Sequence, residues 1–433
     1  MTLQAFRSAI LYFTEDPLGA EEQAYQYLED GLLVVENGCV KQVGEYAALL
    51  SVLPDSVSVT DYSGKLLIPG FVDCHVHYPQ TEMIAAYGKQ LLEWLETHTF
   101  PVESQFADYE YALSIAERFL DELLRNGTTT ALVFGTVHPE SVDAFFTAAR
   151  ARQLRMIAGK VMMDRNAPSA LLDQAETSYQ DSKTLIERWH GVDRLHYAVT
   201  PRFAPTSTPE QLNYVGRLLA EYPDVYMHTH LSENGAELDW VGELFPESQH
   251  YLDVYDQAGL LGQRSVFAHG IHLCDDECQR LSESDSVLAH CPGSNLFLGS
   301  GLFNLPKMDQ YGIRTGIGTD VGGGSSFSML QTLSDAYKVQ QLQGNSLDPF
   351  RALYLATLGG AKALSLDDRI GSFKPGYEAD FIVLDWACTP FMDFRTAQCK
   401  SLAEKLFVLN TLGDDRAIAA TYIMGQLAHQ RDN

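Results

Sequence analysis

Short apolar runs recur along the middle of the chain, and each is followed by a stretch rich in polar residues or glycine. Eight of these runs have the length and composition of strands. They cover residues 71–77, 130–136, 157–162, 196–201, 225–230, 265–270, 286–291 and 314–320. The repetition is one of architecture, because the residues themselves do not repeat.

Apolar residues at helical spacing fill the intervals between several of these runs. Residues 109–126 carry this spacing and stop at Gly127, a residue typical of helix ends. Residues 209–224 and 275–283 show the same spacing, and each precedes a strand-like run. Eight strands that alternate with helices predict a (β/α)8 TIM barrel, an α/β fold.

The two ends of the chain lack this alternation. Residues 30–46 contain two short strand-like runs joined at Asn37-Gly38, which is a strong hairpin signal. Residues 378–386 and 421–429 also resemble strands. We therefore expect both ends of the chain to be mostly β.

Composition is that of an ordinary globular protein. The chain has 433 residues, of which 45% are hydrophobic and 20% charged, so it forms one large domain with an appendage or two to three domains. No run approaches the ~20 apolar residues of a membrane span, and the N-terminal MTLQAFRSAILYFTED lacks the pattern of a signal peptide. Seven scattered cysteines fit free thiols in a reducing cytoplasm better than a disulfide framework.

The net charge of −27 narrows the choice of partners. A strongly acidic surface repels phosphate backbones and anionic lipids. We therefore expect neither a nucleic-acid partner nor a membrane partner, and the charge gives no information about a small substrate.

The first strand-like run ends in His75-Val76-His77. Residues two apart on a strand point to the same side, so both imidazoles are expected to face the barrel interior. The carboxyl ends of the strands are also where barrel enzymes hold their active sites. An isolated pair of histidines is more often structural, so the interpretation depends on the other strands.

The later strands end in residues of the same chemistry. In chain order these residues are His230, His269, His290 and Asp320. Four imidazoles, from His75, His77, His230 and His269, and the carboxylate of Asp320 would stand at matching heights. Such nitrogen and oxygen sets bind divalent transition metals. The sequence therefore predicts a metal centre at the carboxyl face of the barrel.

Several longer motifs make the chain resemble the amidohydrolase superfamily and, within it, the guanine deaminases. The stretches are PGFVDCHVHYPQ, TPRFAPTS, HTHLSEN, VFAHG, HCPGSNLFLGSG and GTDVGGG. A His-x-His followed by three later single ligands is specific to the superfamily, and HVHYPQ together with PRFAPTS is more specific to the guanine deaminases. GSFKPGYEADFIVLD resembles the point at which superfamily chains return to a small β-domain. The resemblance covers nearly the whole chain.

The resemblance implies a (β/α)8 barrel with a small β-sandwich domain built from both chain termini. The expected N-terminal part of the sandwich, the barrel and the C-terminal part are residues 1–66, 67–370 and 371–433. It also implies a hydrolase of purine catabolism that converts guanine and water into xanthine and ammonia. Such an enzyme would hold one Zn²⁺ per chain and act as a cytoplasmic homodimer.

Residue roles follow from the same resemblance. The implied metal ligands are His75, His77, His230 and Asp320. The implied catalytic residues are Glu233 as a proton shuttle, His269 above the metal-bound water, and Asp320. The residues expected to bind the substrate are Gln80, Arg202 and Phe203, which would grip the purine, with His77, His230, Glu233, His269 and Asp320.

The chemistry of these residue types supports the same reaction. Zinc lowers the pKa of bound water to about 7, which makes hydroxide available at neutral pH. Attack on an amino-bearing ring carbon produces a tetrahedral centre, and its nitrogen must be protonated before it leaves. Glu233 and Asp320 can divide the proton transfers, and His269 can stabilise the developing charge.

Two other functions remain open from the residues alone. The first is deamination or dechlorination of another aminopurine, a pterin or a triazine ring. The second is a non-catalytic scaffold on the same barrel, which the intact set of ligands and Glu233 disfavours. The other zinc deaminase architecture, with H-x-E and P-C-x-x-C, is absent in usable form.

Several polar residues near the predicted centre are assigned no catalytic role. Lys160 could bridge a second metal as a carboxylated lysine, but a structural role is expected because the match is to a one-metal branch. His228 is expected to pack in the barrel interior, and His290 to be structural or to support the ligand set. His98 and His138 are expected to lie at the surface.

Overall fold

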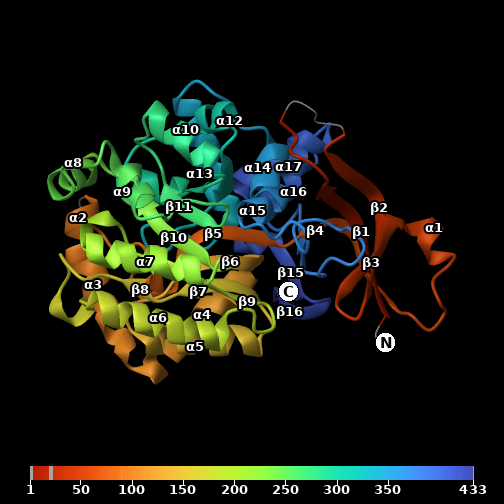
Figure 1. The fold of residues 1–433 in the computed structure, drawn as a ribbon. Coiled ribbons are helices and arrows are strands. Elements are labelled where there is room, and N and C mark those ends of the chain that lie inside the picture. Colours follow the sequence, from red (N-terminus) through yellow and green to blue (C-terminus); the bar gives the residue numbers. More distant parts are fainter. Residues whose placement is uncertain (1–2, 19–22, 89, 433) are drawn as a thin grey trace.

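The computed structural model describes residues 3–18, 23–88 and 90–432. It contains a barrel of parallel strands surrounded by helices, and a mixed sheet formed by both ends of the chain (Figure 1). The predicted fold class is confirmed. The division at residues 66 and 370 stays a prediction.

Every predicted barrel strand overlaps a strand of the structure. They are β5 (Phe71–His77), β6 (Thr128–Phe134), β7 (Arg155–Gly159), β8 (Val161–Met162), β9 (Leu195–Pro201), β10 (Tyr226–Leu231), β11 (Ser265–His269), β12 (Val287–His290) and β13 (Arg314–Ile317). Lys160 divides the predicted run 157–162 into β7 and β8, and both pieces pair with β9.

Backbone hydrogen bonds bring the first strand of the barrel against the segment that follows the last one. The amide of His77 donates to the carbonyl of Val321 at 2.8 Å, and the amide of Asp320 donates to the carbonyl of His75 at 2.9 Å. These bonds place Asp320 beside the His75–His77 pair, although more than 240 residues separate them in the sequence.

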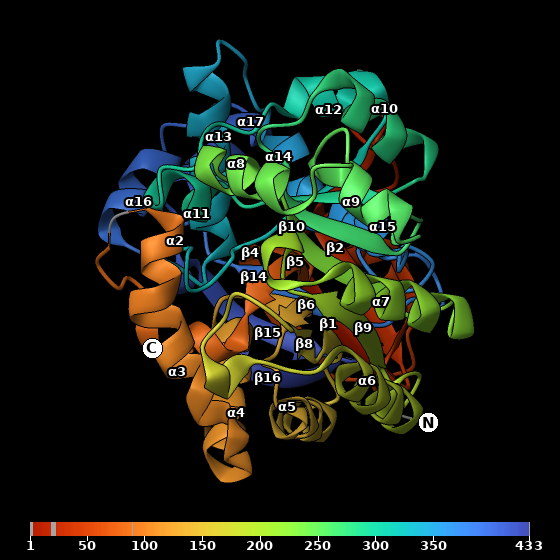
Figure 2. The ribbon, with the colours of Figure 1, turned by 60° about the vertical axis from the view of Figure 1, so that its left-hand side comes forward.

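Helices surround the strands in Figure 2. They are α4 (Tyr109–Arg125), α5 (Pro139–Ala151), α6 (Ala175–Trp189), α7 (Pro209–Glu221), α8 (Gly235–Leu244), α9 (Tyr251–Gln257), α10 (Asp275–Glu283), α11 (Pro292–Phe297), α12 (Leu305–Tyr311), α13 (Met329–Leu342), α14 (Pro349–Leu355) and α15 (Leu358–Ala363). The three predicted helices correspond to α4, α7 and α10. No helix in the described part of the chain is long and apolar enough to cross a membrane.

The boundaries of α4 show how the sequence sets a helix. The side chain of Asp108 accepts hydrogen bonds from the amides of Glu110 and Tyr111 at the first turn. The predicted stop at Gly127 is confirmed, because α4 ends at Arg125 and Gly127 takes a left-handed φ of 79°.

A segment of short helical turns links β5 to α4 and was not predicted. It comprises η1 (Tyr78–Met83), α2 (Leu91–Trp94), η2 (Leu95–Thr99), α3 (Phe100–Glu103) and η3 (Ser104–Ala107). Its buried side chains Met83, Trp94 and Phe100 pack with Phe134 of β6 and Phe203 after β9. The segment therefore lies over the carboxyl end of the barrel.

The second sheet joins the two ends of the chain. Its strands are β1 (Leu3–Phe13), β2 (Tyr25–Glu36), β3 (Cys39–Glu45), β4 (Val59–Pro69), β14 (Phe381–Leu384), β15 (Ile418–Ile423) and β16 (Gln426–Gln430), in the order β16-β15-β14-β4-β1-β2-β3. The remaining elements are α1 (Tyr46–Leu50), η4 (Ser169–Leu171), η5 (Ala204–Thr206), α16 (Pro390–Thr396), α17 (Leu402–Leu412) and η6 (Asp415–Ala417).

The sheet bends so that distant strands face each other across a core. Phe6 of β1 and Tyr422 of β15 have ring centroids 5.0 Å apart, although β4 and β14 lie between these strands in the sheet. The predicted Asn37-Gly38 hairpin is confirmed, with φ angles of 53° and 84°. Residues 421–429, which resembled one strand, form β15 and β16 around a turn.

Buried ion pairs join this sheet to the barrel. Glu378, which precedes β14, accepts hydrogen bonds from Arg155 Nε at 2.7 Å and from Arg194 Nη2 at 2.6 Å. Arg194 also pairs with Asp380. Both arginines lie at the amino ends of barrel strands, so this contact is at the opposite end of the barrel from the predicted metal centre.

Candidate active site

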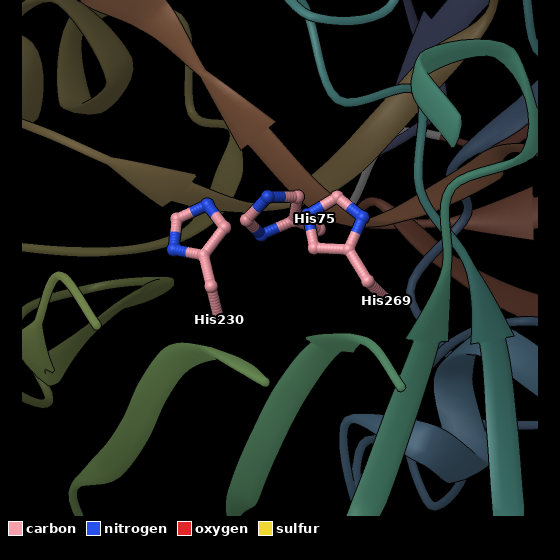
Figure 3. A group of neighbouring side chains, drawn as sticks. All are labelled: His75, His230 and His269. Atoms are coloured by element: carbon pink, nitrogen blue, oxygen red, sulfur yellow. The ribbon is translucent and has the colours of Figure 1, made fainter. Parts of the chain in front are cut away.

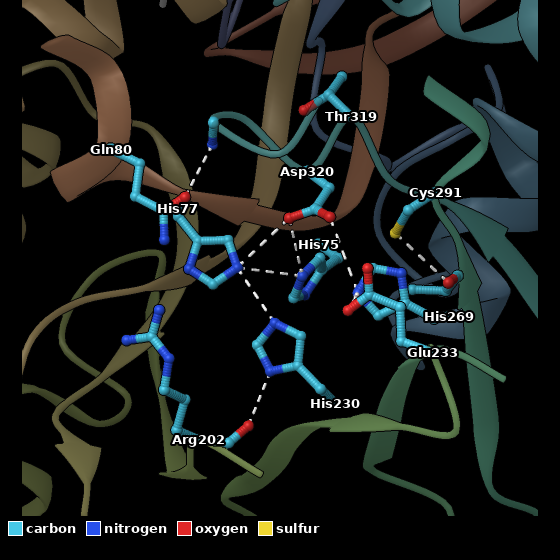
Figure 4. Close-up of polar contacts among 12 residues, drawn as sticks. His75, His77, Gln80, Arg202, His230, Glu233, His269, Cys291, Thr319 and Asp320 are labelled. Carbon is cyan, nitrogen blue, oxygen red and sulfur yellow. Dashed lines mark hydrogen bonds and ion pairs between the residues drawn. The ribbon is translucent and has the colours of Figure 1, made fainter. Parts of the chain in front are cut away.

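Four side-chain atoms converge at the carboxyl end of the barrel (Figure 4). His77 Nε2 lies 3.2 Å from His75 Nε2 and 3.3 Å from His230 Nε2. Asp320 Oδ1 lies 3.2 Å from His75 Nε2 and 3.3 Å from His77 Nε2. The structure thus brings together the four side chains predicted to be metal ligands.

The spacing of these atoms fits a tetrahedral metal. Ligands placed about 2.0–2.1 Å from a tetrahedral zinc lie about 3.3–3.4 Å from one another. His230 Nδ1 donates to the carbonyl of Arg202 at 2.7 Å, so its neutral ring has a lone pair on Nε2. Lone pairs that face one another at this distance repel unless a cation lies between them. The donor set therefore fits a bound divalent metal.

Burial keeps the imidazoles neutral. It lowers the pKa of His75, lowers the pKa of His77 to about 4 and holds the pKa of His230 well below its ordinary value. Burial acts in the opposite sense on Asp320, but the neighbouring imidazoles, His75 first, hold the pKa of its carboxyl well below the ordinary value. The site thus offers three neutral nitrogens and one carboxylate.

Side chains behind the ligands hold the rings in place. His228 Nε2 lies 2.8 Å from His75 Nδ1, so the buried histidine predicted to be packed also bonds to a candidate ligand. The ring of Phe134 stacks on His77 with centroids 4.5 Å apart and also contacts the rings of His75 and His230. Sequence reasoning found neither contact.

His269 lies in one group of side chains with His75 and His230 (Figure 3). Its Nε2 lies 3.3 Å from Glu233 Oε2 and 3.7 Å from Asp320 Oδ2. Its Nδ1 donates to Asn295 Oδ1 at 2.8 Å. His269 and Asp320 have left-handed φ angles of 74° and 50°, a conformation that is strained for these residues and concentrates at functional sites.

Glu233 has the properties of a proton-transfer group. It is buried, and its Oε1 accepts a hydrogen bond from Ser300 Oγ at 2.9 Å. Burial raises its pKa to about 8, and the charge of Asp320 adds to the effect. A carboxyl group with a pKa near neutrality can both give and accept a proton in one cycle.

A pocket opens above these groups. Its wall contains predicted residues from the barrel and apolar residues from the unpredicted segment and the loop after β12. The lining residues are His77, Gln80, Leu91, Trp94, Leu95, Arg202, Phe203, His230, Glu233, Glu237, His269, Leu298, Asp320 and Gly323. The pocket thus includes every residue predicted to bind the substrate.

Gln80 and Arg202 extend toward each other beside His77 (Figure 4). Arg202 forms a two-pronged ion pair with Glu103 of α3, at 2.6 and 3.1 Å. Gln80 donates to the same carboxylate at 3.0 Å. Sequence reasoning missed Glu103, because nothing in the sequence placed α3 against the end of β9.

The other polar residues lie where a structural role would place them. Lys160 Nζ pairs with Asp173 and donates to Ser178 Oγ at 3.1 Å. His290 stacks on Phe303 with ring centroids 4.4 Å apart. His98 and His138 are not among the residues that line the pocket in the described part of the chain.

Two further groups of side chains in the described residues could hold a metal. One is His75, His230 and His269, and the other is His75, Cys291 and Asp320. Burial holds the pKa of the Cys291 thiol well above its ordinary value. In the four-residue set above, the four spacings of 3.2–3.3 Å suit a single tetrahedral ion.

A sequence profile of the Amidohydrolase family matches residues 66–428. The chain belongs to the amidohydrolase family. Amidohydrolases depend on a bound metal, and the described residues contain side-chain groups around His75 that could hold one. The match spans all of the barrel strands and the C-terminal strands β14 and β15.

Individual relatives cover the whole length. The chain is 56% identical over 433 residues to a guanine deaminase of Escherichia coli strain K12, with 100% of this chain and 99% of the relative covered. A solved structure of E. coli guanine deaminase superposes with a TM-score of 0.97, 54% identity and full coverage of both chains. The structure of a guanine deaminase from C. acetobutylicum with bound guanine in the active site matches with a TM-score of 0.89 and 29% identity, over 98% of this chain and 100% of that chain.

Proposed function

We propose that this amidohydrolase is a guanine deaminase, which converts guanine and water into xanthine and ammonia. The observation that carries the proposal is the convergence of three neutral imidazoles and Asp320 beside Glu233, in one pocket with Arg202 and Gln80. The full-length likeness to guanine deaminases supports the choice of substrate.

The metal of this site is proposed to be one zinc ion per chain, held by His75, His77, His230 and Asp320. When bound, the ion supplies a water whose pKa is low enough for hydroxide to form at neutral pH. A set of three imidazole nitrogens and one carboxylate favours zinc over magnesium or calcium, because those two ions prefer oxygen ligands. The bonds of His75 to His228 and of His230 to the Arg202 carbonyl orient two of the rings.

Glu233, His269 and Asp320 divide the proton transfers. Glu233 takes a proton from the attacking water and delivers it to the ring nitrogen next to the reacting carbon. Asp320, whose Oδ2 faces His269, accepts a second proton that is passed to the departing amino nitrogen. In its protonated form His269 donates from Nδ1 to Asn295 and would donate from Nε2 toward the oxygen that develops negative charge.

Arg202, Gln80 and Phe203 read the purine. The guanidinium of Arg202 offers donors for O6 and N7 of guanine, both of which are acceptors. Gln80 can donate and accept at a second edge of the ring, and the buried ring of Phe203 forms an apolar wall. The same pocket is lined by His77, His230, Glu233, His269 and Asp320, which would surround the reacting carbon.

We further propose that the protein is a cytoplasmic homodimer, which the resemblance to guanine deaminases supports. Sedimentation of the purified protein at micromolar concentration tests the oligomeric state. A single species of twice the chain mass supports the dimer, and a single species of 48.1 kDa refutes it.

A substrate panel tests the proposed function. The purified protein is incubated separately with guanine, adenine, cytosine and ammeline, and ammonia is followed. Release from guanine alone supports the proposal. Faster release from adenine or from the triazine ammeline would instead support the alternative of another ring substrate.

A further inference from the structure

A buried carboxylate links the two residues that are proposed to read the base. Arg202 Nη1 donates to Glu103 Oε2 at 2.6 Å, and Arg202 Nη2 donates to Oε1 at 3.1 Å. Gln80 Nε2 donates to the same Oε1 at 3.0 Å. All three residues are at most 2% exposed, so water cannot replace these bonds.

Helix α3 holds the guanidinium of Arg202 from two sides. Phe100 and Glu103 are three residues apart, so they share one face of α3. The guanidinium carbon of Arg202 lies 5.4 Å from the centroid of the Phe100 ring, while Glu103 accepts from two of its nitrogens. A guanidinium has five N–H donors, and this pairing uses two of them. The pairing thus leaves three donors of Arg202, a residue that lines the pocket, outside the bonds to Glu103.

The same carboxylate determines the orientation of the Gln80 amide. Its nitrogen donates to Glu103, and its oxygen accepts from the amide of Gly322 at 3.1 Å. The reversed orientation would set an oxygen against the carboxylate and an amino group against an N–H. Gln80 therefore has one favourable orientation, which leaves one donor and one lone pair in fixed places.

We propose that Glu103 is a positioning residue for substrate specificity, because it fixes the donor and acceptor pattern that Arg202 and Gln80 present to the base. Glu103 itself is not among the residues lining the pocket in the described part of the chain, so it acts through the other two. The inference rests on the proposed function, since it concerns how a 6-oxopurine is distinguished from other purines.

Glu103→Gln tests this role with little change in shape. A glutamine at this position has one acceptor oxygen and one amino group, so it cannot accept at both corners as the carboxylate does. Either Arg202 loses a bond, or Gln80 turns over. Both changes alter the groups offered to the O6 edge and leave the apolar walls in place.

Equilibrium binding of hypoxanthine and purine provides the readout. Hypoxanthine has O6 and N7, purine lacks O6, and neither carries an amino group that could be released. Their dissociation constants can therefore be measured by calorimetry on the metal-loaded protein without turnover. Ammonia release from guanine by the unaltered protein tests the proposed function separately.

The expected result is a selective loss. Glu103→Gln should weaken hypoxanthine binding by about tenfold or more and purine binding by less than about threefold, at unchanged metal content. Equal weakening of both ligands, or no change in either, would overturn the proposal, because a merely structural role would not distinguish O6.

Two further variants provide a second test and a control. Glu103→Asp keeps the negative charge but shortens the side chain, so the carboxylate cannot reach both partners. This variant should also weaken the binding of hypoxanthine selectively. It replaces Glu103→Gln in the test if that variant does not fold. Asp309→Asn breaks a two-pronged pair with Arg351 of similar geometry, at 2.7 and 2.6 Å, outside the pocket. It should leave both dissociation constants unchanged, and a shift like that of Glu103→Gln would contradict a specific role for Glu103.

Discussion

Glu233 Oε2 and His269 Nε2 face each other at 3.3 Å, and Asp320 Oδ2 lies 3.7 Å from the same imidazole nitrogen. Two carboxyl groups thus meet one histidine at the edge of the ligand cluster. Their environments set them apart, since Glu233 has a pKa raised to about 8 and Asp320 a pKa held well below its ordinary value. Such a separation divides acid and base roles between neighbouring carboxyl groups.

Glu233→Gln should remove proton transfer and retain the metal. The amide keeps a hydrogen bond to Ser300 but cannot carry a proton, so kcat for guanine should fall by about 10²–10⁴-fold. Turnover and metal content are measured on the same preparation. Near-normal turnover would assign the acid to another group.

Ser300→Ala is the matched control for that variant. It removes the hydroxyl that donates to Glu233 and leaves the carboxyl group itself. Its turnover should fall far less than that of Glu233→Gln. A loss of equal size would mean that the position of the carboxyl, rather than its proton, is what the first variant disturbs.

Arg202→Ala should cost about 2–4 kcal/mol in kcat/KM for guanine, in line with the loss of charge-assisted contacts. The variant also leaves the buried carboxylate of Glu103 unpaired, so part of the loss reflects that charge. The double variant Arg202→Ala with Glu103→Gln should therefore regain stability without regaining kcat/KM. An unchanged kcat/KM in Arg202→Ala, at unchanged metal content, would show that Arg202 does not read the base.

Lys160→Met tests the one-metal arrangement. Lys160 pairs with Asp173 and Ser178 in the structure, so its loss should lower the free energy of unfolding by about 3 kcal/mol, as for other broken buried pairs. The metal content per folded chain should not change. Elemental analysis that finds two metals in the natural protein and one in this variant would contradict a structural role.

Glu378→Gln tests the contact between the sheet and the barrel. Burial opposes the ionisation of Glu378, but Arg155 and Arg194 lower its pKa below the ordinary value. A carboxyl with a depressed folded pKa stabilises the fold above its unfolded pKa of about 4.3, and the stabilisation is lost as pH falls through the folded pKa.

The variant should therefore lower the free energy of unfolding at pH 7, with a smaller effect in acid. Urea unfolding at pH 7 and near pH 4 measures the difference, and KM for guanine should not change at either pH. A stability loss that is larger in acid than at pH 7 would contradict the assigned charge state of Glu378.

The histidines at the strand ends were predictable from the sequence, because their spacing matches the two-residue period of a strand. His75 and His77 lie two apart on one strand, and His230 ends another, so the barrel pattern alone placed them at one face. Their convergence at 3.2–3.3 Å depends on the closure of the barrel through the His77–Val321 hydrogen bond, a long-range contact that no local pattern encodes.

The support for the base-reading residues was not predictable in the same way. Glu103 reaches Arg202 from a segment of short helical turns that has neither strand nor helix periodicity over a useful length. The two residues are 99 apart in the sequence. The contact of His228 with His75 was also missed, since a position on the same strand face predicts burial but not which ring lies opposite.

Zinc titration of the metal-free protein tests the central claim most directly. The metal is removed with a chelator, zinc is added back in known equivalents, and conversion of guanine to xanthine is followed, with adenine as the comparison. The predicted result is no conversion without metal, a rise that ends at about one equivalent per chain, and no measurable reaction of adenine. Conversion that persists without metal, or adenine reacting as well as guanine, would contradict the account.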